Sequence, residues 1–546
     1  MARLFFPQYQ KSREGIPLSP GLTILEHAQQ GEIEINAECG GNGTCGKCIV
    51  RIEQGGEFLN RKTPEEEKTA LGEKERLACR ASVGRDGGDI VAFIKNFGRY
   101  EILKHGLQRK IPLRPRYTKK DGTVRCDGVE IDRYRGAIYG IAVDIGTTTV
   151  VFDLVDLENG DILATMARTN PQISYGNDVI SRIEFILVDK KEHRYHGPDE
   201  KKERSRVLQQ TIVQAINDSL AELSRRLGND VGELIYETVI VGNPTMRNLF
   251  FGLDVSSLGL HPFEPDHTEA VVRPPKEIGL SVNPSGSIYG APLIGGHVGA
   301  DTLANVLATG IALTDGVCMI IDIGTNGEIV VGNKDRLLSA SAAAGGAFEG
   351  ATVGCGVGAI EGAIKEIRFE DGRIVYSTIG NKHPVGIVGS GFIDLLAGML
   401  DHGIMTQRAR ITGDYHITAE LKVTQDDIFR LVTSKAAIKT AEEILMKLYP
   451  AAPERLDKVY LSGGFGNYIN AAHAAHLGII PPVPESTVVK IGNGALEGAR
   501  EMLVCLDCRI LGEKIARRIE HVKTNEVEPD FDFMVARNMY FEPDEG

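Results

Sequence analysis

The sequence lacks any uninterrupted apolar run of the roughly 18 residues that a membrane-spanning helix requires. Its N-terminal stretch, MARLFFPQYQKSREG, also lacks the apolar core and the cleavage signature of a secretory signal peptide. Tryptophan is absent, which excludes nothing, and no low-complexity tract stands out. These absences predict a cytoplasmic protein that does not span a membrane.

Positive charge is in deficit over the whole chain. The 61 lysine and arginine residues are outnumbered by 74 aspartate and glutamate residues, which gives a formal net charge of −13. This balance argues against general nucleic-acid binding. Residues 96–137 have the opposite charge balance, because they contain 11 basic and 5 acidic residues. They also contain prolines and show little periodicity. We therefore expect a basic, partly extended linker there.

A chain of 546 residues is too long for one compact core, so several domains are expected. Residues 1–95 have the pattern of a small β-rich unit with short helices. From residue 138 to 546, short β-branched apolar runs alternate with longer helical patterns, which indicates an α/β sheet architecture. The predicted fold class is multidomain, α+β followed by α/β.

A cysteine-rich loop, AECGGNGTCGKC, runs from Ala37 to Cys48. Cys39, Cys45 and Cys48 are separated by five and then two residues, and thirty more residues separate Cys48 from Cys79. Thiolates suit zinc or iron–sulfur centres. Structural zinc sites usually take their ligands from two short pairs, whereas here one long loop supplies three. This pattern favours a loop that folds around a group larger than a single ion. A zinc site and free thiols stay open as the alternative interpretations.

This stretch resembles the cluster-binding loop of 2Fe–2S ferredoxins of the β-grasp type. The first gap is one residue longer than the plant-type spacing, which is the adrenodoxin-like variant, and the RLAC before the last cysteine also fits. The resemblance implies a 2Fe–2S cluster held by Cys39, Cys45, Cys48 and Cys79. The remaining cysteines are expected to be packing residues. Cys505 and Cys508 form a CxxC pair within an apolar helical pattern, which favours core over redox chemistry.

An internal repeat marks the long C-terminal region. YGIAVDIGTTTVVFDLV (139–155) and CMIIDIGTNGEIVVGN (318–333) share an apolar strand, Asp-Ile-Gly-Thr, a polar turn and a second strand. Backbone N–H groups and threonine hydroxyls at such a turn can donate to phosphate oxygens, and a neighbouring carboxylate can hold Mg²⁺ through water. Two copies predict a duplicated domain with two lobes, about 138–315 and 316–546, around one nucleotide cleft.

A third element, LSGGFGNYIN (461–470), is a strand followed by a glycine-rich turn where a base or ribose can lie against bare backbone. Together the three elements resemble the acetate kinase, sugar kinase, Hsp70 and actin superfamily of ATPases, with its ribonuclease H-like lobes. The resemblance implies ATP and Mg²⁺ as ligands. It assigns the first phosphate motif to Asp144, Gly146, Thr147, Thr148 and Thr149, and the second to Asp322, Gly324, Thr325 and Asn326. The adenosine motif falls on Gly463, Gly464, Phe465, Gly466 and Asn467.

The order of ferredoxin domain, linker and ATPase domain resembles the reductive activators of corrinoid proteins. That resemblance implies an ATP-dependent enzyme that passes an electron from its 2Fe–2S cluster to the inactive Co(II) of a corrinoid protein and so restores Co(I) for anaerobic methyl transfer. No side chain is needed as a nucleophile, because the transferred species is an electron. The implied partners are the corrinoid protein and a low-potential electron donor, with a second copy of the chain as a further candidate.

Three other readings stay open on the residues alone. The first is a metabolite kinase of the same superfamily whose ferredoxin domain senses redox state, although no carboxylate base for a substrate hydroxyl can be identified. The second is a chaperone-like protein that hydrolyses ATP without redox turnover. The third is an activator of a radical dehydratase, a family that instead carries a 4Fe–4S cluster between subunits.

Overall fold

The computed structural model describes most of the chain, which divides into two compact units. The described residues are 2–7, 15–31, 33, 35, 37, 41, 43, 48–69, 71–84, 88–94, 107, 109–189, 192–350, 352–370, 373–449, 455–463 and 468–541. Six predicted site residues lie outside them, namely Cys39, Cys45, Gly464, Phe465, Gly466 and Asn467. Unit 1 comprises residues 1–99 and 169–204, and unit 2 comprises residues 100–168 and 205–546.

The N-terminal segment of unit 1 forms a mixed sheet and two short helices in its described part. The strands, in order across the sheet, are β2 (Ile16–Pro17), β1 (Arg3–Phe5), β5 (Ile90–Ile94), β3 (Ile49–Gln54) and β4 (Glu75–Leu77), and the helices are α1 (Ile24–Gln30) and α2 (Pro64–Glu67). β1 pairs antiparallel with β2 and parallel with β5, and β3 pairs antiparallel with both of its neighbours. The β-rich unit with short helices is confirmed.

A buried ion pair fixes strand β4 to helix α2. Glu66, which is 1% exposed, accepts hydrogen bonds from Arg76 Nε at 2.8 Å and from the Leu77 N–H at 2.9 Å. Burial alone would raise the pKa of Glu66, but the bonds from Arg76 and from the backbone lower it below its ordinary value. The pair holds the strand that ends two residues before Cys79.

The second segment of unit 1 adds a helix and a short hairpin. Its elements are α3 (Val179–Leu187), β12 (Val188–Asp189), β13 (Arg194–Tyr195) and the first residues of α4 (Pro198–Leu227). Asp178 caps α3 by accepting a hydrogen bond from the Ser181 N–H at 2.7 Å. Gln29 Nε2 of α1 donates to the Ser174 carbonyl oxygen at 2.6 Å, so the two segments of unit 1 are in contact.

Unit 2 contains two six-stranded sheets in which five strands follow the same order and the sixth lies at opposite edges. The first is β11 (Ile162–Thr169), β10 (Thr149–Asp156), β9 (Tyr139–Ile145), β14 (Ile235–Gly242), β16 (Ser287–Gly290) and β15 (Val271–Arg273). The second is β19 (Leu337–Ala342), β18 (Gly327–Gly332), β17 (Cys318–Ile323), β25 (Lys458–Ser462) and β26 (Val488–Gly492), with β27 (Glu520–His521) beside β19. We call residues 138–168 and 205–315 lobe 1 and residues 316–546 lobe 2.

The two lobes repeat one topology. In each, the first two strands form an antiparallel hairpin, β9–β10 or β17–β18, and the first strand also pairs in parallel with the fourth, β14 or β25. The predicted duplication is therefore confirmed. It brings the two Asp-Ile-Gly-Thr sequences to the same position in each lobe, at the turn that joins the first two strands.

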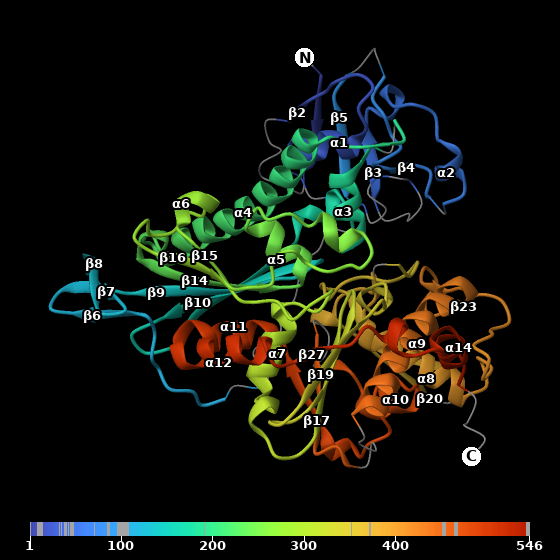
Figure 1. Ribbon diagram of the computed structural model, residues 1–546. Helices are drawn as coiled ribbons and strands as arrows, with labels where there is room; N and C mark the ends of the chain where they lie inside the picture. The colour runs from blue at the N-terminus through green and yellow to red at the C-terminus, as the bar shows by residue number, and fades with distance from the viewer. Residues whose placement is uncertain are drawn as a thin grey trace. The chain divides into compact units, whose positions relative to one another are not determined.

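The lobes meet through a pair of equivalent helices. α7 (Ala300–Thr309) follows the fifth strand of lobe 1, α11 (Gly494–Val504) follows the fifth strand of lobe 2, and the two pack against each other (Figure 1). Their backbones come close at Gly498, because a Cβ atom there would lie 2.1 Å from the Ala304 carbonyl oxygen. Side chains of both lobes form one apolar core around this pair.

The remaining elements surround the two sheets. The helices are α5 (Pro244–Phe250), α6 (Pro275–Ile278), α8 (Gly389–Asp401), α9 (Gln425–Leu448), α10 (Ala471–His476), α12 (Leu506–Ala516), α13 (Thr524–Val527) and α14 (Phe531–Asn538). The strands are β20 (Ala363–Glu370), β21 (Arg373–Thr378), β22 (Gly386–Ile387), β23 (Tyr415–His416) and β24 (Lys422–Val423). Near the C-terminal end, Asn538 Nδ2 donates to Thr440 Oγ1 of α9 at 3.0 Å.

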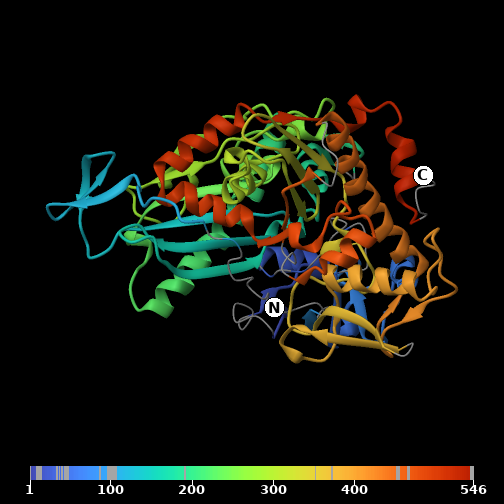
Figure 2. The same cartoon turned by 90° about the horizontal axis from the view of Figure 1, so that it is seen from below.

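The predicted linker contains a folded three-stranded meander. Its strands are β6 (Tyr117–Lys120), β7 (Thr123–Cys126) and β8 (Val129–Arg133), and it lies at one end of the lobe 1 sheet, cyan in Figures 1 and 2. The Tyr117 hydroxyl donates to Ser287 Oγ at 2.9 Å, and the Tyr236 hydroxyl donates to Asp132 Oδ2 at 2.9 Å. The meander is thus part of unit 2.

The residues that precede the meander are also fixed to unit 2. Arg109 forms an ion pair with Glu501, which is fully buried, at 2.7 Å. The Arg114 N–H donates to the Val504 carbonyl oxygen at 2.8 Å, at the junction of α11 and α12. The side chains of Arg109, Arg114 and Arg116 thus form ion pairs within unit 2, with Glu501, Asp507 and Asp127.

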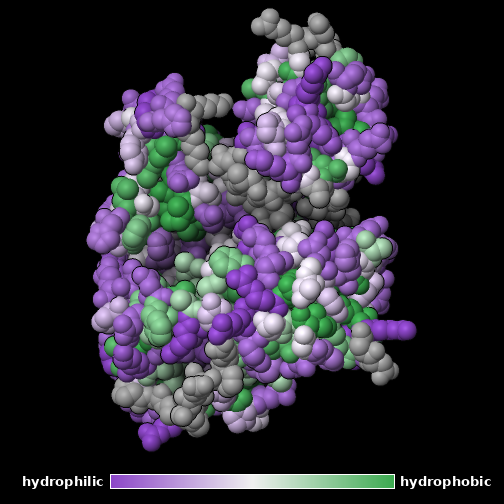
Figure 3. All heavy atoms as spheres, turned by 90° about the vertical axis from the view of Figure 1, so that its right-hand side faces the viewer, coloured by the Kyte–Doolittle hydropathy of each residue, from purple (hydrophilic) through white to green (hydrophobic). Residues whose placement is uncertain are grey.

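No helix among the residues described above combines the length and the apolar character needed to cross a lipid bilayer. On the face of the molecule in Figure 3, hydrophilic and hydrophobic residues are intermixed in small areas. This mixed surface is what the composition leads us to expect of a globular chain.

Gly498→Ala is expected to lower the free energy of unfolding of unit 2 by about 1–3 kcal/mol, because the new methyl group overlaps the backbone of α7. Gly512→Ala is the matched control. Its Cβ atom would meet the end of the Leu307 side chain at 3.1 Å, which can move aside. Urea unfolding of the two variants checks this. Equal stability of the two would show that the helix contact at Gly498 is not tight.

Candidate functional site

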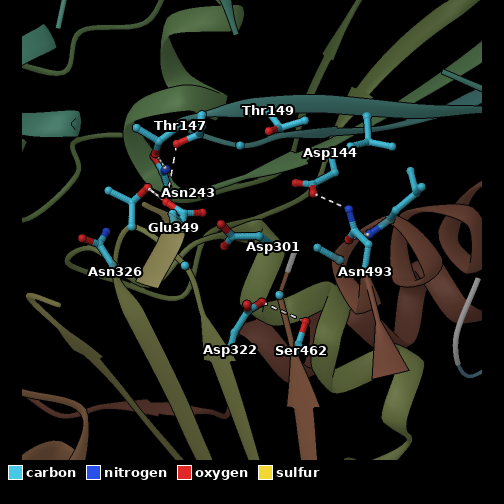
Figure 4. A pocket seen from close by; sticks show the side chains of 18 of the residues that line it. Asp144, Thr147, Thr149, Asn243, Asp301, Asp322, Asn326, Glu349, Ser462 and Asn493 are labelled. Atoms are coloured by element: carbon cyan, nitrogen blue, oxygen red, sulfur yellow. Dashed lines mark hydrogen bonds between the residues drawn. The ribbon is translucent and has the colours of Figure 1, made fainter. Parts of the chain in front are cut away.

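The two Asp-Ile-Gly-Thr turns line a single cavity between lobe 1 and lobe 2. Its volume is about 210 Å³ (Figure 4). Ten of the predicted nucleotide-site residues are among its lining: Asp144, Gly146, Thr147, Thr148, Thr149, Asp322, Gly324, Thr325, Asn326 and Gly463. The structure thus brings together sequences about 180 residues apart.

Each turn aspartate is held by an asparagine that the other lobe provides. Asp144, near the end of β9, accepts a hydrogen bond at 2.9 Å from Asn493, which is the N-cap of α11 in lobe 2. Asp322, at the equivalent place in β17, accepts one at 2.6 Å from Asn305 of α7 in lobe 1. Ser462 Oγ also donates to Asp322, at 3.0 Å. The position of each carboxylate therefore depends on both lobes.

The turns themselves are tight. The Gly146 N–H donates to the Thr149 carbonyl oxygen at 3.0 Å, and the Gly324 N–H donates to the Asn326 carbonyl oxygen at 3.0 Å. Such turns point backbone and hydroxyl groups into the space between the hairpins, which is a common way to hold a phosphate. In lobe 1, Asn243 Nδ2 donates to Thr147 Oγ1 at 2.9 Å and so orients that side chain.

A glycine stands at the end of the fourth strand of each lobe: Gly242 is the last residue of β14, and Gly463 follows the last residue of β25. Gly242 and Gly463 have positive φ angles of 153° and 123°. A Cβ atom on Gly242 would lie 2.6 Å from the Ile145 carbonyl oxygen, and one on Gly463 would lie 2.5 Å from that of Ile323. Only glycine allows this approach. In lobe 1, the residue that follows the glycine is Asn243, which lines the cavity.

Five carboxyl groups face the cavity. They belong to Asp144, Asp301, Asp322, Glu328 and Glu349. Burial, followed by the charge of neighbouring carboxylates, raises the pKa of Asp301 to about 7. Burial also raises the pKa of Asp144 and of Glu349 to about 7, and it raises those of Asp322 and Glu328. In Figure 4 the Asp301 side chain lies between those of Asp144 and Asp322.

This concentration of acidic groups has no basic counterpart among the described residues of the lining, which include no lysine and no arginine. A polyphosphate would be repelled by such a cavity unless it arrived with a divalent cation. Mg²⁺ is commonly held by one or two carboxylates, several waters and the phosphates themselves. In the described part of the chain, no three His, Cys, Asp or Glu side chains form a metal site by themselves.

Six polar residues of the lining were not predicted from the sequence: Asn243, Asp301, Glu328, Glu349, Ser462 and Asn493. Three of them lie at the start of a helix. Asn243 is the N-cap of α5, Asp301 lies in the first turn of α7, and Asn493 is the N-cap of α11.

Two of the four predicted cluster ligands lie in the described part of unit 1. Cys48 and Cys79 are almost fully buried, at 1% and 5% exposed, and their sulfur atoms are 3.3 Å apart. Cys48 precedes β3 and Cys79 follows β4, so the pairing of these two strands brings the sulfur atoms together. The two thiols face each other, as ligands of one metal centre must.

The CxxC pair of lobe 2 differs from a reactive thiol site. Cys505 lies at the junction of α11 and α12, Cys508 lies in α12, and both are buried as free thiols. Burial, together with a hydrogen bond to Cys505, raises the pKa of Cys508 to about 12. The pair belongs to the apolar core around α7 and α11, as the sequence predicted.

Comparisons with known proteins cover almost the whole chain. Residues 9–84 match the profile of the 2Fe-2S iron-sulfur cluster binding domain, residues 139–314 that of the RACo middle region, and residues 316–545 that of the C-terminal domain of RACo, the ASKHA domain. The chain is 30% identical to the corrinoid activation enzyme RamQ of Eubacterium limosum, over 95% of this chain and 96% of that protein.

Two further proteins extend this likeness. The chain is 27% identical to the [Co(II) methylated amine-specific corrinoid protein] reductase of Methanosarcina barkeri, over 67% of this chain and 70% of that one. A solved structure, a reductive activator for corrinoid,iron-sulfur protein, superposes with a TM-score of 0.70 and 26% identity, covering 99% of this chain and 98% of that structure.

Asp144→Ala and Asp322→Ala are each expected to lower the rate of ATP turnover at least about 100-fold, because each removes the carboxylate of one Asp-Ile-Gly-Thr turn from the cavity. The visible absorbance of the iron–sulfur domain should not change, since the residues lie in unit 2. Asp161→Ala, an exposed residue of lobe 1, is the control. Phosphate release assays measure the rates, and unchanged turnover in both variants would remove these residues from the site.

Proposed function

The chain belongs to the family of the reductive activators of corrinoid proteins, and from this premise we propose that it reduces the inactive Co(II) of a corrinoid protein to Co(I) with the help of ATP. The observation that carries the proposal is the likeness to a corrinoid activation enzyme over 95% of the chain. It includes both the thiol pair of unit 1 and the two-turn cavity of unit 2. A cluster held by the cysteines of unit 1 would supply the one electron that the cobalt needs, and it would be oxidised as the cobalt is reduced.

In this proposal the electron carrier is a 2Fe–2S cluster held by Cys39, Cys45, Cys48 and Cys79. The facing sulfur atoms of Cys48 and Cys79 support this assignment, because soft thiolate ligands suit such a cluster. The buried pair of Glu66 and Arg76 holds the strand next to Cys79. A cluster at this place would have two of its ligands in the core of the unit.

The ATP–Mg²⁺ site is assigned to the cavity between the two turns. Asp144 and Asp322 are proposed to bind the cation through water, and the threonines of both turns to donate to phosphate oxygens. Asp301 lies between the two aspartates and is the carboxylate that we assign to the attacking water. The adenosine end is assigned to Gly463 and to the residues that follow it, Gly464, Phe465, Gly466 and Asn467.

ATP has a clear use in such a reaction. One electron moved uphill by about 200 mV costs about 4.6 kcal/mol. ATP binding or hydrolysis can offset that cost only if the nucleotide state and the cobalt state change each other's affinity for the protein. The reciprocal Asp–Asn bonds support this coupling, because a nucleotide that shifts one lobe also alters the contacts of the other.

We propose electron transfer for residues 1–95 and ATP use for residues 138–546, as predicted. Between these two ranges, the described residues from Arg109 onward are held by unit 2. A low-potential donor in the cytoplasm is the proposed source of electrons.

The full chain, prepared without oxygen, is expected to contain about two iron atoms and two acid-labile sulfides per molecule. Cys48→Ser and Cys79→Ser should each lose most of this content, whereas Cys126→Ser, outside the loop, should retain it. Metal and sulfide analysis with visible absorbance makes the measurement. Zinc in place of iron, or iron without sulfide, would contradict the cluster.

Formation of Co(I) should require a reduced cluster and ATP together, and the ATPase should be stimulated by the Co(II) form of the corrinoid protein but not by its methylated form. A ligand indifferent to the cobalt state shifts no equilibrium, however tightly it binds. The test mixes the titanium-reduced protein with a Co(II) corrinoid protein and follows the Co(I) absorbance band. Equal Co(I) formation without nucleotide would favour the redox-sensing metabolite kinase instead.

A further inference from the structure

Glu349 is the one carboxylate of the described cavity that contacts both phosphate turns. It accepts a hydrogen bond from Thr325 Oγ1 of the lobe 2 turn and lies 3.5 Å from Thr148 Oγ1 of the lobe 1 turn. Asp144 and Asp322, by contrast, each belong to one turn and are held by asparagines. Glu349 therefore joins the two lobes at the point where phosphates are proposed to bind.

The segment that carries Glu349 is mounted firmly on lobe 2. The Gly346 N–H donates to the Thr325 carbonyl oxygen at 3.1 Å, and the neighbouring Phe348 is fully buried in the lobe 2 core. Gly350, with a φ of 76°, is packed so closely that a Cβ atom would lie 2.4 Å from Val357 N. Of the contacts around Glu349, the one with Thr148 reaches across to lobe 1.

This arrangement conflicts with a bound triphosphate. The carboxylate and a phosphate oxygen are both acceptors, so they compete for the same threonine hydroxyl protons. In its ionised form the carboxylate also repels the negatively charged phosphate at close range. The cavity of about 210 Å³ is also smaller than the roughly 300–1,000 Å³ of typical ligand pockets. A nucleotide must displace the Glu349 carboxylate before it can use both turns.

We propose that Glu349 is a latch that joins the two phosphate turns in the nucleotide-free protein and is displaced from Thr148 when Mg²⁺–ATP binds. The proposal rests on the assignment of the cavity as the ATP site. The latch keeps the lobes in one relative position until a nucleotide replaces its carboxylate with phosphate oxygens. Part of the binding free energy of the nucleotide is then used to release the lobe contact, which is how a bound ligand changes the population of a second state.

Glu349→Gln tests the latch, because the latch predicts that this substitution raises the affinity for the nucleotide. The amide keeps the size of the side chain and removes the charge, so the affinity for Mg²⁺–AMPPNP should rise roughly tenfold, because the competing state is weakened. A residue that only binds Mg²⁺ or only supports the fold would give weaker nucleotide binding after the same change. Titration calorimetry on the full chain measures the affinity. Glu361→Gln, an exposed glutamate of the same segment, is the control and should leave the affinity unchanged.

Glu349→Asp distinguishes the effect of side-chain length from the effect of side-chain charge. Aspartate keeps the negative charge but is one methylene shorter, so it should not span both turns and should also bind the nucleotide more tightly than the wild type. Wild-type affinity in this variant would mean that charge alone opposes the nucleotide, and it would overturn the latch. Weaker binding by the glutamine variant would overturn it too. Wild-type protein that binds no nucleotide would instead remove the proposed function.

Discussion

The contact between α7 and α11 is the constraint on which the site depends. The two helices occupy equivalent places in the two lobes, and their backbones approach at Gly498. Each also positions an asparagine for the aspartate of the opposite lobe, Asn305 for Asp322 and Asn493 for Asp144. If the helices slid past each other, both carboxylates would lose their orientation at once. A cavity built this way exists only when the lobes are in register, which makes it suited to sense and to transmit a change in their relative position.

The parts of the site that could be predicted are those encoded by local sequence. An apolar strand followed by Asp-Ile-Gly-Thr specifies a hairpin turn by itself, and finding it twice indicated the duplication. Glu328 lies in β18, two residues after the second turn, and was not recognised there. Asp301 and Glu349 could not be assigned to the site from a turn motif, because each reaches the cavity only through the packing of whole elements. Glu349 in particular lies in a glycine-rich segment whose path depends on left-handed backbone at Gly346 and Gly350, and no short pattern reveals which side chain such a segment presents.

The basic segment before lobe 1 contained a sequence signal for hairpin turns, but its composition favoured the prediction of a linker. Its proline content, charge and weak periodicity favoured a linker, yet the sequence contains two Asp-Gly pairs six residues apart. Asp121 and Asp127 both have positive φ angles, followed by glycines that do as well, which is the backbone of tight hairpin turns. The strands between them are too short for an alternating pattern to be recognised. Turn chemistry was thus the better guide here than hydrophobic periodicity.

The protonation state of the thiols outside the cysteine loop determines how readily oxidants attack them. Burial raises the pKa of Cys126, Cys318 and Cys508 above that of an exposed thiol, so at neutral pH these side chains stay protonated. Peroxide and molecular oxidants attack thiolates far more readily than thiols. Accidental exposure to air should therefore leave these three thiols of unit 2 largely unoxidised. Protein inactivated by such exposure would be a candidate for repair by rebuilding its cluster, without refolding of the rest of the chain.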